Sequence, residues 1–147
     1  MIDIKLVIYP AWVVNQSISP EEAGDAAEFY GLYIEASIYR TPGICKPFIF
    51  DGCSAVNNFL KVFLTEEQYL VVTQNICRPH DIVYGVCTST KRRAEADEKF
   101  KADLIATGYL SEHLCNIAYR MVREFGATNE TWGPGFALNP GFKAEVE

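Results

Sequence analysis

Apolar residues recur along much of this chain with the spacing of an α-helix. Between residues 111 and 126, an apolar stripe lies on one helix face and consists of Leu114, Ile117, Ala118, Met121, Val122 and Phe125. Other segments carry the start and stop signals of helices, so that helices are predicted at 17–40, 65–87, 91–108 and 111–126. The pattern therefore predicts a mainly α fold, a small helical domain in which the second and third helices form an antiparallel hairpin.

Capping residues support these helix boundaries. Ser19 precedes a proline and is followed three residues later by Glu22, which matches a capping box. Thr65 and Gln68 repeat the same spacing at the second helix. Gly108 is a natural end for the third helix, because glycine readily adopts the left-handed conformation that ends many helices.

The remaining segments are less regular. Residues 4–14 are rich in Ile, Val and aromatic side chains, which predicts a strand or a packed N-terminal arm. Residues 40–59 contain Pro and Gly at intervals and favour a long loop, and residues 128–147 form an irregular tail. A length of 147 residues fits one domain, 1–147.

The composition and charge of the chain disfavour some classes of function. The formal net charge of -6 disfavours binding to nucleic acid, which requires clustered cations. The short basic run at 91–93 is followed by acidic residues and is typical of a solvated helix start. No apolar run has the length of a membrane-spanning helix. The first fourteen residues lack the basic leader of a signal peptide. Five cysteines leave at least one unpaired in a monomer, and one or two disulfides are plausible in an oxidising compartment.

The stretch "ICRPHDIVYGVC", residues 76–87, holds the candidate chemistry. On a helix, His80 and Tyr84 share a face, while Asp81 points about 100° away. Pro79 either kinks this helix or restarts it. In a helix hairpin, Asp97 would return beside His80, where a carboxylate fixes the imidazole tautomer and stabilises its protonated form.

A cation site follows from the same arrangement. Asp81 would be free to bind a cation, and the loop "FDGCS" offers the carboxylate of Asp51 and a close backbone approach at Gly52. Calcium binds such hard oxygen ligands, namely carboxylates, backbone carbonyls and water. The sequence therefore predicts a site for Ca²⁺.

Four segments in order, "DGCS", "CRPHDIVYG", "ADEKFKADL" and "CNIAYRMVREFG", make residues 48–127 resemble the secreted phospholipases A2 of bacteria and fungi. The resemblance implies a phospholipase A2-like core at 46–127, an N-terminal extension at 1–45 and a phospholipid or membrane surface as partner. It implies a disulfide between Cys53 and Cys77 and, more loosely, a second between Cys87 and Cys115. It also implies the following roles: His80 as the general base, Asp97 as its partner, Tyr84 as an orienting residue, and Asp51, the carbonyl of Gly52 and Asp81 as calcium ligands.

The same pattern also resembles small phage-encoded proteins of uncertain function, with Phe125, Gly126 and Trp132 as the late part of the match. That resemblance implies a non-enzymatic interaction protein that retains the His-Asp helix as a structural cluster. The segment 1–45 lies outside both resemblances and is a candidate for binding a protein partner. The chain would be secreted or virion-associated as a phospholipase and cytoplasmic otherwise. Its oligomeric state stays open.

Three further interpretations compete. His80 with its neighbours can be a buried hydrogen-bond cluster that only specifies packing. A zinc site would use Cys77 and His80 with His113 and Cys115, although the spacing is unusual for a four-ligand site. The stretch "TWGPGF" can expose Trp132 and Phe136 to a lipid surface, or it can be a packed tail.

Overall fold

A computed structural model describes residues 10–128 and 135–142 of the chain, with side chains described as far as residue 126 in the last helix. The described chain is mainly helical, which confirms the predicted fold class. In order, its elements are β1 (Gln16–Ile18), α1 (Pro20–Phe29), α2 (Tyr33–Arg40), β2 (Phe48–Phe50), α3 (Asn57–Phe63), α4 (Glu66–Val72), the π-helix η1 (Thr73–Cys77), α5 (Arg78–Val86), α6 (Thr90–Thr107) and α7 (Glu112–Thr128).

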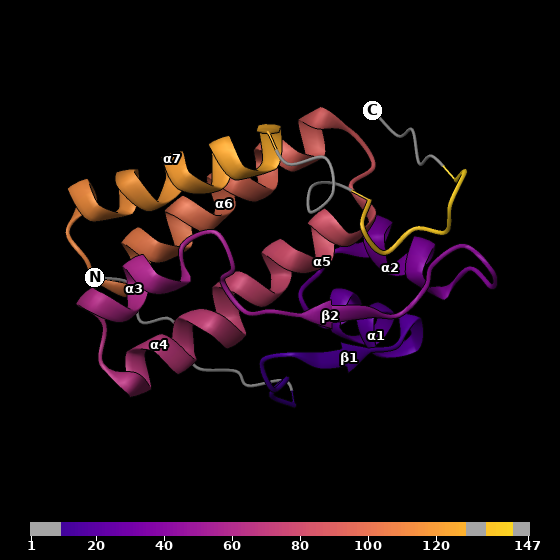
Figure 1. Ribbon diagram of the computed structural model, residues 1–147, viewed down its shortest axis with the longest axis horizontal. Helices are drawn as coiled ribbons and strands as arrows, with labels where there is room; N and C mark the ends of the chain where they lie inside the picture. Colours follow the sequence, from indigo (N-terminus) through magenta and orange to yellow (C-terminus); the bar gives the residue numbers. More distant parts are fainter. Residues whose placement is uncertain (1–9, 129–134, 143–147) are drawn as a thin grey trace.

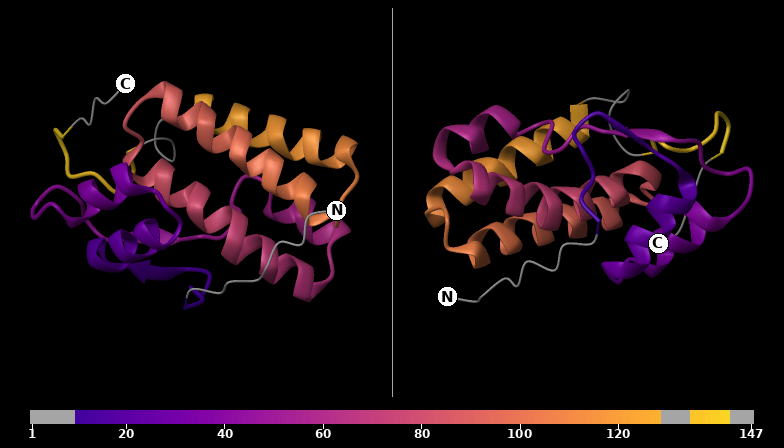
Figure 2. Two further views of the ribbon diagram at one scale, coloured as in Figure 1. Left: turned by 180° about the vertical axis from the view of Figure 1, so that it is seen from behind. Right: turned by 90° about the horizontal axis from the view of Figure 1, so that it is seen from below.

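The helices form two layers. Helices α6 and α7 lie side by side in one layer, and the rod formed by α4, η1 and α5 crosses the molecule in the other (Figure 1). Helices α1 and α2 and the small sheet pack at one end of this rod, and α3 lies near its other end (Figure 2). Because only a short turn joins α5 to α6, the expected helix hairpin is present.

The predicted caps are confirmed at three helix ends. Ser19 with Glu22 and Thr65 with Gln68 form complete capping boxes at α1 and α4. Gly108 ends α6 with a φ of 70°, in the left-handed region. The single helix predicted at 17–40 is wrong, because the chain leaves the helix after α1 and passes through Gly31 at a φ of 76° before α2 begins.

Pro79 lies in the first turn of α5, where a regular α-helix restarts after a π-helix and the backbone stays helical across the junction. The five-residue π-helix Thr73–Cys77 precedes it, so that the rod continues from α4 into α5. Proline has no N–H to donate, and its ring would clash with the carbonyl of an ordinary preceding turn. The wider π-turn accommodates both restrictions without ending the helix. His80, the next residue, therefore stays on a regular helix.

The N-terminal half departs further from the expectation. The strand that pairs with β2 is β1, with Gln16 opposite Phe50 and Ile18 opposite Phe48, rather than a segment within 4–14. The alternative of a packed arm holds at Trp12, which is buried in the core. Residues 4–9 lie outside the described chain. The loop predicted at 40–59 contains β2 and the start of α3. Ordered structure in this loop is relevant to the site, since β2 leads directly into Asp51.

The core consists of two main clusters, which pack against successive parts of the rod formed by α4, η1 and α5. One cluster packs η1 against α3, α6 and α7, and its fully buried members include Leu60, Val72, Leu104 and Ala118. The other packs α1, α2 and the sheet against Ile82 and Val86 of α5. The described part of the N-terminal extension therefore shares its core with α5. None of the helices in the described chain has the length and apolar character needed to cross a membrane.

Candidate active site

The side chains of His80 and Asp97 meet across the α5–α6 hairpin. His80 lies six residues before the end of α5, and Asp97 lies seven residues after the start of α6, so that an antiparallel pair places them opposite each other. The distance from His80 Nε2 to Asp97 Oδ1 is 2.6 Å. Tyr84, one turn after His80, donates its hydroxyl to the same Oδ1 at 2.6 Å. The structure therefore brings together the three residues that the sequence analysis singles out around the imidazole.

Asp97 has a third partner that the sequence analysis missed. Arg123 of α7 donates from Nη1 to Asp97 Oδ2 at 2.8 Å. Burial by itself raises the pKa of Asp97, whose side chain is fully enclosed, but the hydrogen bonds from His80, Tyr84 and Arg123 outweigh burial and lower that pKa below its ordinary value. Asp97 is thus an ionised acceptor, Nε2 of His80 carries the proton of their hydrogen bond, and Nδ1 is left as the basic nitrogen.

Tyr84 is held as a proton donor. Burial and the neighbouring charge of Asp97 both raise the pKa of the Tyr84 phenol, so its hydroxyl stays protonated. Gly126 of α7 makes room for this hydroxyl, since a Cβ at position 126 would lie 2.6 Å from Tyr84 Oη. The imidazole of His80 lies between the rings of Tyr84 and Phe100, with ring centroids 4.4 Å and 5.2 Å away. The ring has little freedom to turn.

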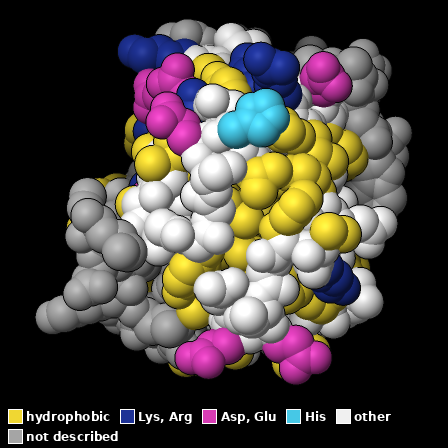
Figure 3. Space-filling view, turned by 90° about the vertical axis from the view of Figure 1, so that its left-hand side faces the viewer, with side chains coloured by type: hydrophobic (Ala, Val, Ile, Leu, Met, Phe, Trp, Pro, Cys, Tyr) yellow, Lys and Arg dark blue, Asp and Glu magenta, His cyan; other side chains and the backbone are white. Residues whose placement is uncertain are grey.

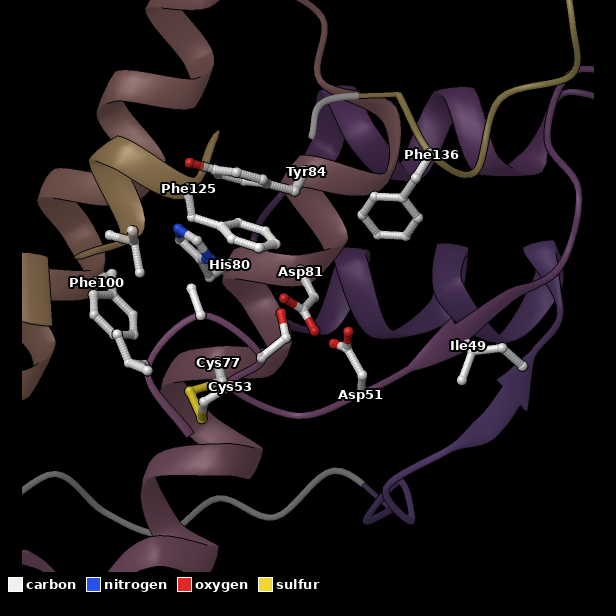
Figure 4. A pocket seen from close by; sticks show the side chains of 14 residues that line it. Ile49, Asp51, Cys53, Cys77, His80, Asp81, Tyr84, Phe100, Phe125 and Phe136 are labelled. Carbon is white, nitrogen blue, oxygen red and sulfur yellow. A yellow bond between two sulfur atoms is a disulfide. The ribbon is translucent and has the colours of Figure 1, made fainter. Parts of the chain in front are cut away.

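Two carboxylates face each other beside His80. The side chains of Asp51 and Asp81 point toward one another in Figure 4. Burial, and then the negative charge of Asp51, raise the pKa of Asp81 well above its ordinary value. Burial also raises the pKa of Asp51, although a hydrogen bond with Ser54 opposes it. Within the described chain, the Asp81 carboxylate has no hydrogen-bond donor. A pair of like charges of this kind suits a divalent cation, because the cation would remove the repulsion.

A disulfide fixes the loop that carries Asp51. Cys53 is bonded to Cys77, the last residue of η1, with a Cα–Cα distance of 5.3 Å. Gly52 between the aspartate and the cysteine has a φ of 74°, a conformation that favours glycine. The Cys53–Cys77 bridge thus ties the loop to the rod three residues before His80.

The second disulfide expectation is wrong, since Cys87 and Cys115 both carry free thiols. Cys87 follows α5 and lies near the start of α6, whereas Cys115 is buried near the start of α7, beside the end of α6. The 18 residues of α6 separate the two ends by about 27 Å, far beyond the reach of a disulfide.

An open cavity of about 80 Å³ lies against His80. Asp51 and Asp81 line one part of it, and the walls are mostly apolar: Ile49, Val56, Phe100, Val122, Phe125 and Phe136 (Figure 4). The side chain of His80 is 11% exposed, so solvent and small groups reach it. Phe136 belongs to this lining, while Trp132 lies outside the described residues.

A second cavity of about 110 Å³ lies on the other side of His80, between α5 and α6. His80 and Phe100 line both cavities and separate them. The charges on the rim of the second cavity are already paired, Lys99 with Asp103 and Arg92 with Glu35 and Glu95. Among the described residues that line the two cavities, the carboxylates without an ion-pair partner, Asp51 and Asp81, line only the first.

The described residues do not support a zinc site. The sulfur of Cys77 is in the disulfide, and His113 is exposed on the first turn of α7. Across residues 10–128 and 135–142, no three His, Cys, Asp or Glu side chains cluster closely enough to hold a metal. Of the predicted calcium ligands, Asp51 and Asp81 line the cavity, whereas Gly52 is not among its lining residues. The chemistry of the two carboxylates fits calcium.

The chain was compared with family models, with curated proteins and with solved structures. No family model matches it. No curated protein and no solved structure matches it either.

The repulsion between Asp51 and Asp81 leads to a prediction about stability. Because the pKa of Asp81 is higher in the folded than in the unfolded chain, the free energy of unfolding falls as the pH rises between these two values. In metal-free neutral buffer, Asp81→Asn should therefore stabilise the fold by about 1 kcal/mol, which corresponds to roughly 3–5 °C in melting temperature for this chain length. Calorimetric melting at neutral and acidic pH measures the effect.

The matched control is Glu98→Gln, which removes an exposed carboxylate from α6 and should leave the melting temperature nearly unchanged. A melting temperature of Asp81→Asn below that of the wild type at neutral pH would contradict the unfavourable pairing of the two carboxylates.

Proposed function

We propose that this chain is a calcium-dependent, phospholipase A2-like ester hydrolase. One observation supports the proposal above all: the hydrogen-bonded pair of His80 and Asp97 borders an open apolar cavity that also holds Asp51 and Asp81. A base, a cation site and an apolar binding space thus lie together, as hydrolysis of a lipid ester requires. The resemblance of residues 48–127 to the secreted phospholipases A2 of bacteria and fungi supports the same function.

In the proposed reaction, Nδ1 of His80 takes a proton from a water molecule in the cavity, and the water oxygen attacks the ester carbonyl carbon at the second acyl position. Asp97 stabilises the imidazolium that forms, and Tyr84 holds the carboxylate of Asp97 in place. The ester bond then breaks, and the leaving alkoxide takes the proton from His80. A calcium ion bound by Asp51, Asp81 and the carbonyl of Gly52 would stabilise the negative charge on the attacked oxygen.

The surface around the cavity supports a lipid substrate. Ile49 at the cavity edge is 55% exposed, and the Val13–Val14 turn lies next to Gly52, with Val14 Cγ2 3.5 Å from an added Cβ at that glycine. Helix α3 lies at the end of the molecule away from α1 and α2 (Figures 1 and 2), and its Val62 is 75% exposed. Figure 3 shows apolar side chains gathered at the end of the molecule where α3 lies. We define Val13, Val14, Ile49 and Val62 as the apolar rim, which would face the membrane.

The proposal is tested first by hydrolysis of phosphatidylcholine in the presence of calcium. His80→Gln should lower kcat by about 10²–10⁴-fold, because it removes the base but leaves an amide of similar size. Release of fatty acid measures the rate, and the melting curve shows that the variant folds. The control is His113→Gln, which changes the exposed histidine and should retain full activity.

Hydrolysis that persists in His80→Gln would overturn the proposed mechanism. A wild type that hydrolyses no glycerophospholipid, with His80→Gln mainly less stable, would instead favour the non-enzymatic interaction protein.

Calcium binding is a separate prediction that requires no turnover. Isothermal titration with calcium should show one site in the wild type, which is lost in Asp81→Asn and in Asp51→Asn because each removes a carboxylate ligand. Glu98→Gln should bind calcium like the wild type. The cation site is refuted if the wild type shows no binding, or if Asp81→Asn binds as tightly.

The apolar rim predicts where the protein meets lipid. Vesicles of ether-linked phosphatidylcholine cannot be hydrolysed at the second position, so they report binding alone. Val13→Asp and Val62→Asp should each weaken vesicle binding about tenfold, since each removes an apolar side chain from the contact. Cosedimentation measures the bound fraction.

Tyr33→Asp is the matched control, because Tyr33 on α2 is 70% exposed, as is Val13, but lies outside the apolar rim. Equal weakening by Tyr33→Asp would mean that the added charge, rather than this face, decides binding.

A further inference from the structure

Arg123 completes the ring of donors around Asp97. His80 and Tyr84 both use Oδ1 of the carboxylate, and among the described residues Arg123 alone binds Oδ2, at 2.8 Å. The three donors come from α5 and α7, while Asp97 belongs to α6, so that one carboxylate joins three helices. Arg123 does not line the cavity next to Asp51 and Asp81. Its hydrogen bond to Asp97 is therefore the direct contact through which Arg123 can act on the dyad.

The contact on Oδ2 determines how the carboxylate can rotate. The terminal torsion of an aspartate is broad, and two donors on a single oxygen leave the other oxygen free to swing. A guanidinium on Oδ2 fixes the plane of the group and supplies a positive charge to a buried anion. The other arginine of this region, Arg93, lies beside Tyr84 but forms no ion pair with Asp97 within the described chain. Arg123 therefore has no substitute among the described residues.

We propose that Arg123 is a positioning residue of the dyad: by holding Oδ2 of Asp97, it keeps Oδ1 directed at Nε2 of His80. This arrangement fixes the imidazole tautomer in which Nδ1 is free to take the proton of water. The role rests on the proposed function for its catalytic consequence, but the fixed tautomer is a property of the folded chain and can be observed without turnover.

The kinetic test compares three variants of the full chain on phosphatidylcholine with calcium. Arg123→Met should lower kcat about 10- to 100-fold with KM changed less than twofold, because the base is misaligned while the cavity is intact. Arg123→Lys retains the charge and should recover part of the loss. Arg120→Met is the control, since Arg120 is exposed on the same helix and should behave as the wild type.

A double-mutant cycle separates positioning from general damage to the fold. If Arg123 acts through Asp97, Arg123→Met should cause little further loss in an Asp97→Asn background. Losses that simply multiply in the double variant, or a wild-type kcat in Arg123→Met, would overturn the proposal. Where Arg123→Met does not fold, the same cycle is measured with Arg123→Lys.

A spectroscopic test decides the inference even if the chain hydrolyses no lipid. The protein has two histidines, so long-range ¹H–¹⁵N correlation spectra in alkaline buffer resolve both imidazoles, with the exposed His113 as a reference. The wild type and Arg120→Met should show His80 as one tautomer, with the proton on Nε2. Arg123→Met should show mixed tautomers. An unchanged single tautomer in Arg123→Met overturns the role of Arg123, whereas absence of lipid hydrolysis in the wild type overturns only the proposed function.

Discussion

The buried carboxylate of Asp97 is the group on which the arrangement of the site depends. A carboxylate removed from water without partners costs several kcal/mol, and removal of one partner from a buried ion pair is similarly costly. Asp97 avoids this cost only when α5 supplies His80 and Tyr84 and α7 supplies Arg123. The same contacts therefore pack the three helices and align the imidazole. A chain that misplaces α7 would also misplace His80.

Unlike Asp97, the carboxylates of Asp51 and Asp81 are not stabilised by positively charged partners in the described chain. Their carboxylates face each other, and the pKa of each is raised. Among the described residues, no Lys or Arg side chain pairs with either of them, so their repulsion destabilises the fold. The chain nevertheless maintains the approach, since the Cys53–Cys77 disulfide ties the loop of Asp51 to the rod that carries Asp81. Two carboxylates held close together beside a candidate base support the proposed function over a cluster that only specifies packing.

Local signals in the sequence predicted the parts of the fold that depend on local chemistry. The caps at Ser19, Thr65 and Gly108 are confirmed, and the hairpin that brings Asp97 to His80 follows from two neighbouring helices. Features that depend on distant contacts were not predicted. Arg123 sits in a segment dominated by an apolar stripe, and nothing near it in the sequence indicates a partner on α6. The π-helix before Pro79 is likewise a compromise with the surrounding packing, which a proline alone does not reveal.

The linings of the two cavities beside His80 explain why the proposed reaction would take place in only one of them. Both are partly apolar, and both touch the imidazole through the wall that His80 shares with Phe100. On the α5–α6 side, every charge that lines the cavity has an ion-pair partner, so that side has little to gain from a cation. On the other side, the two carboxylates have no positive partner within the described chain, and Nδ1 of His80 is the remaining basic atom of the dyad. A cation and a water molecule would therefore meet the dyad from this side, next to the apolar walls that an acyl chain would contact.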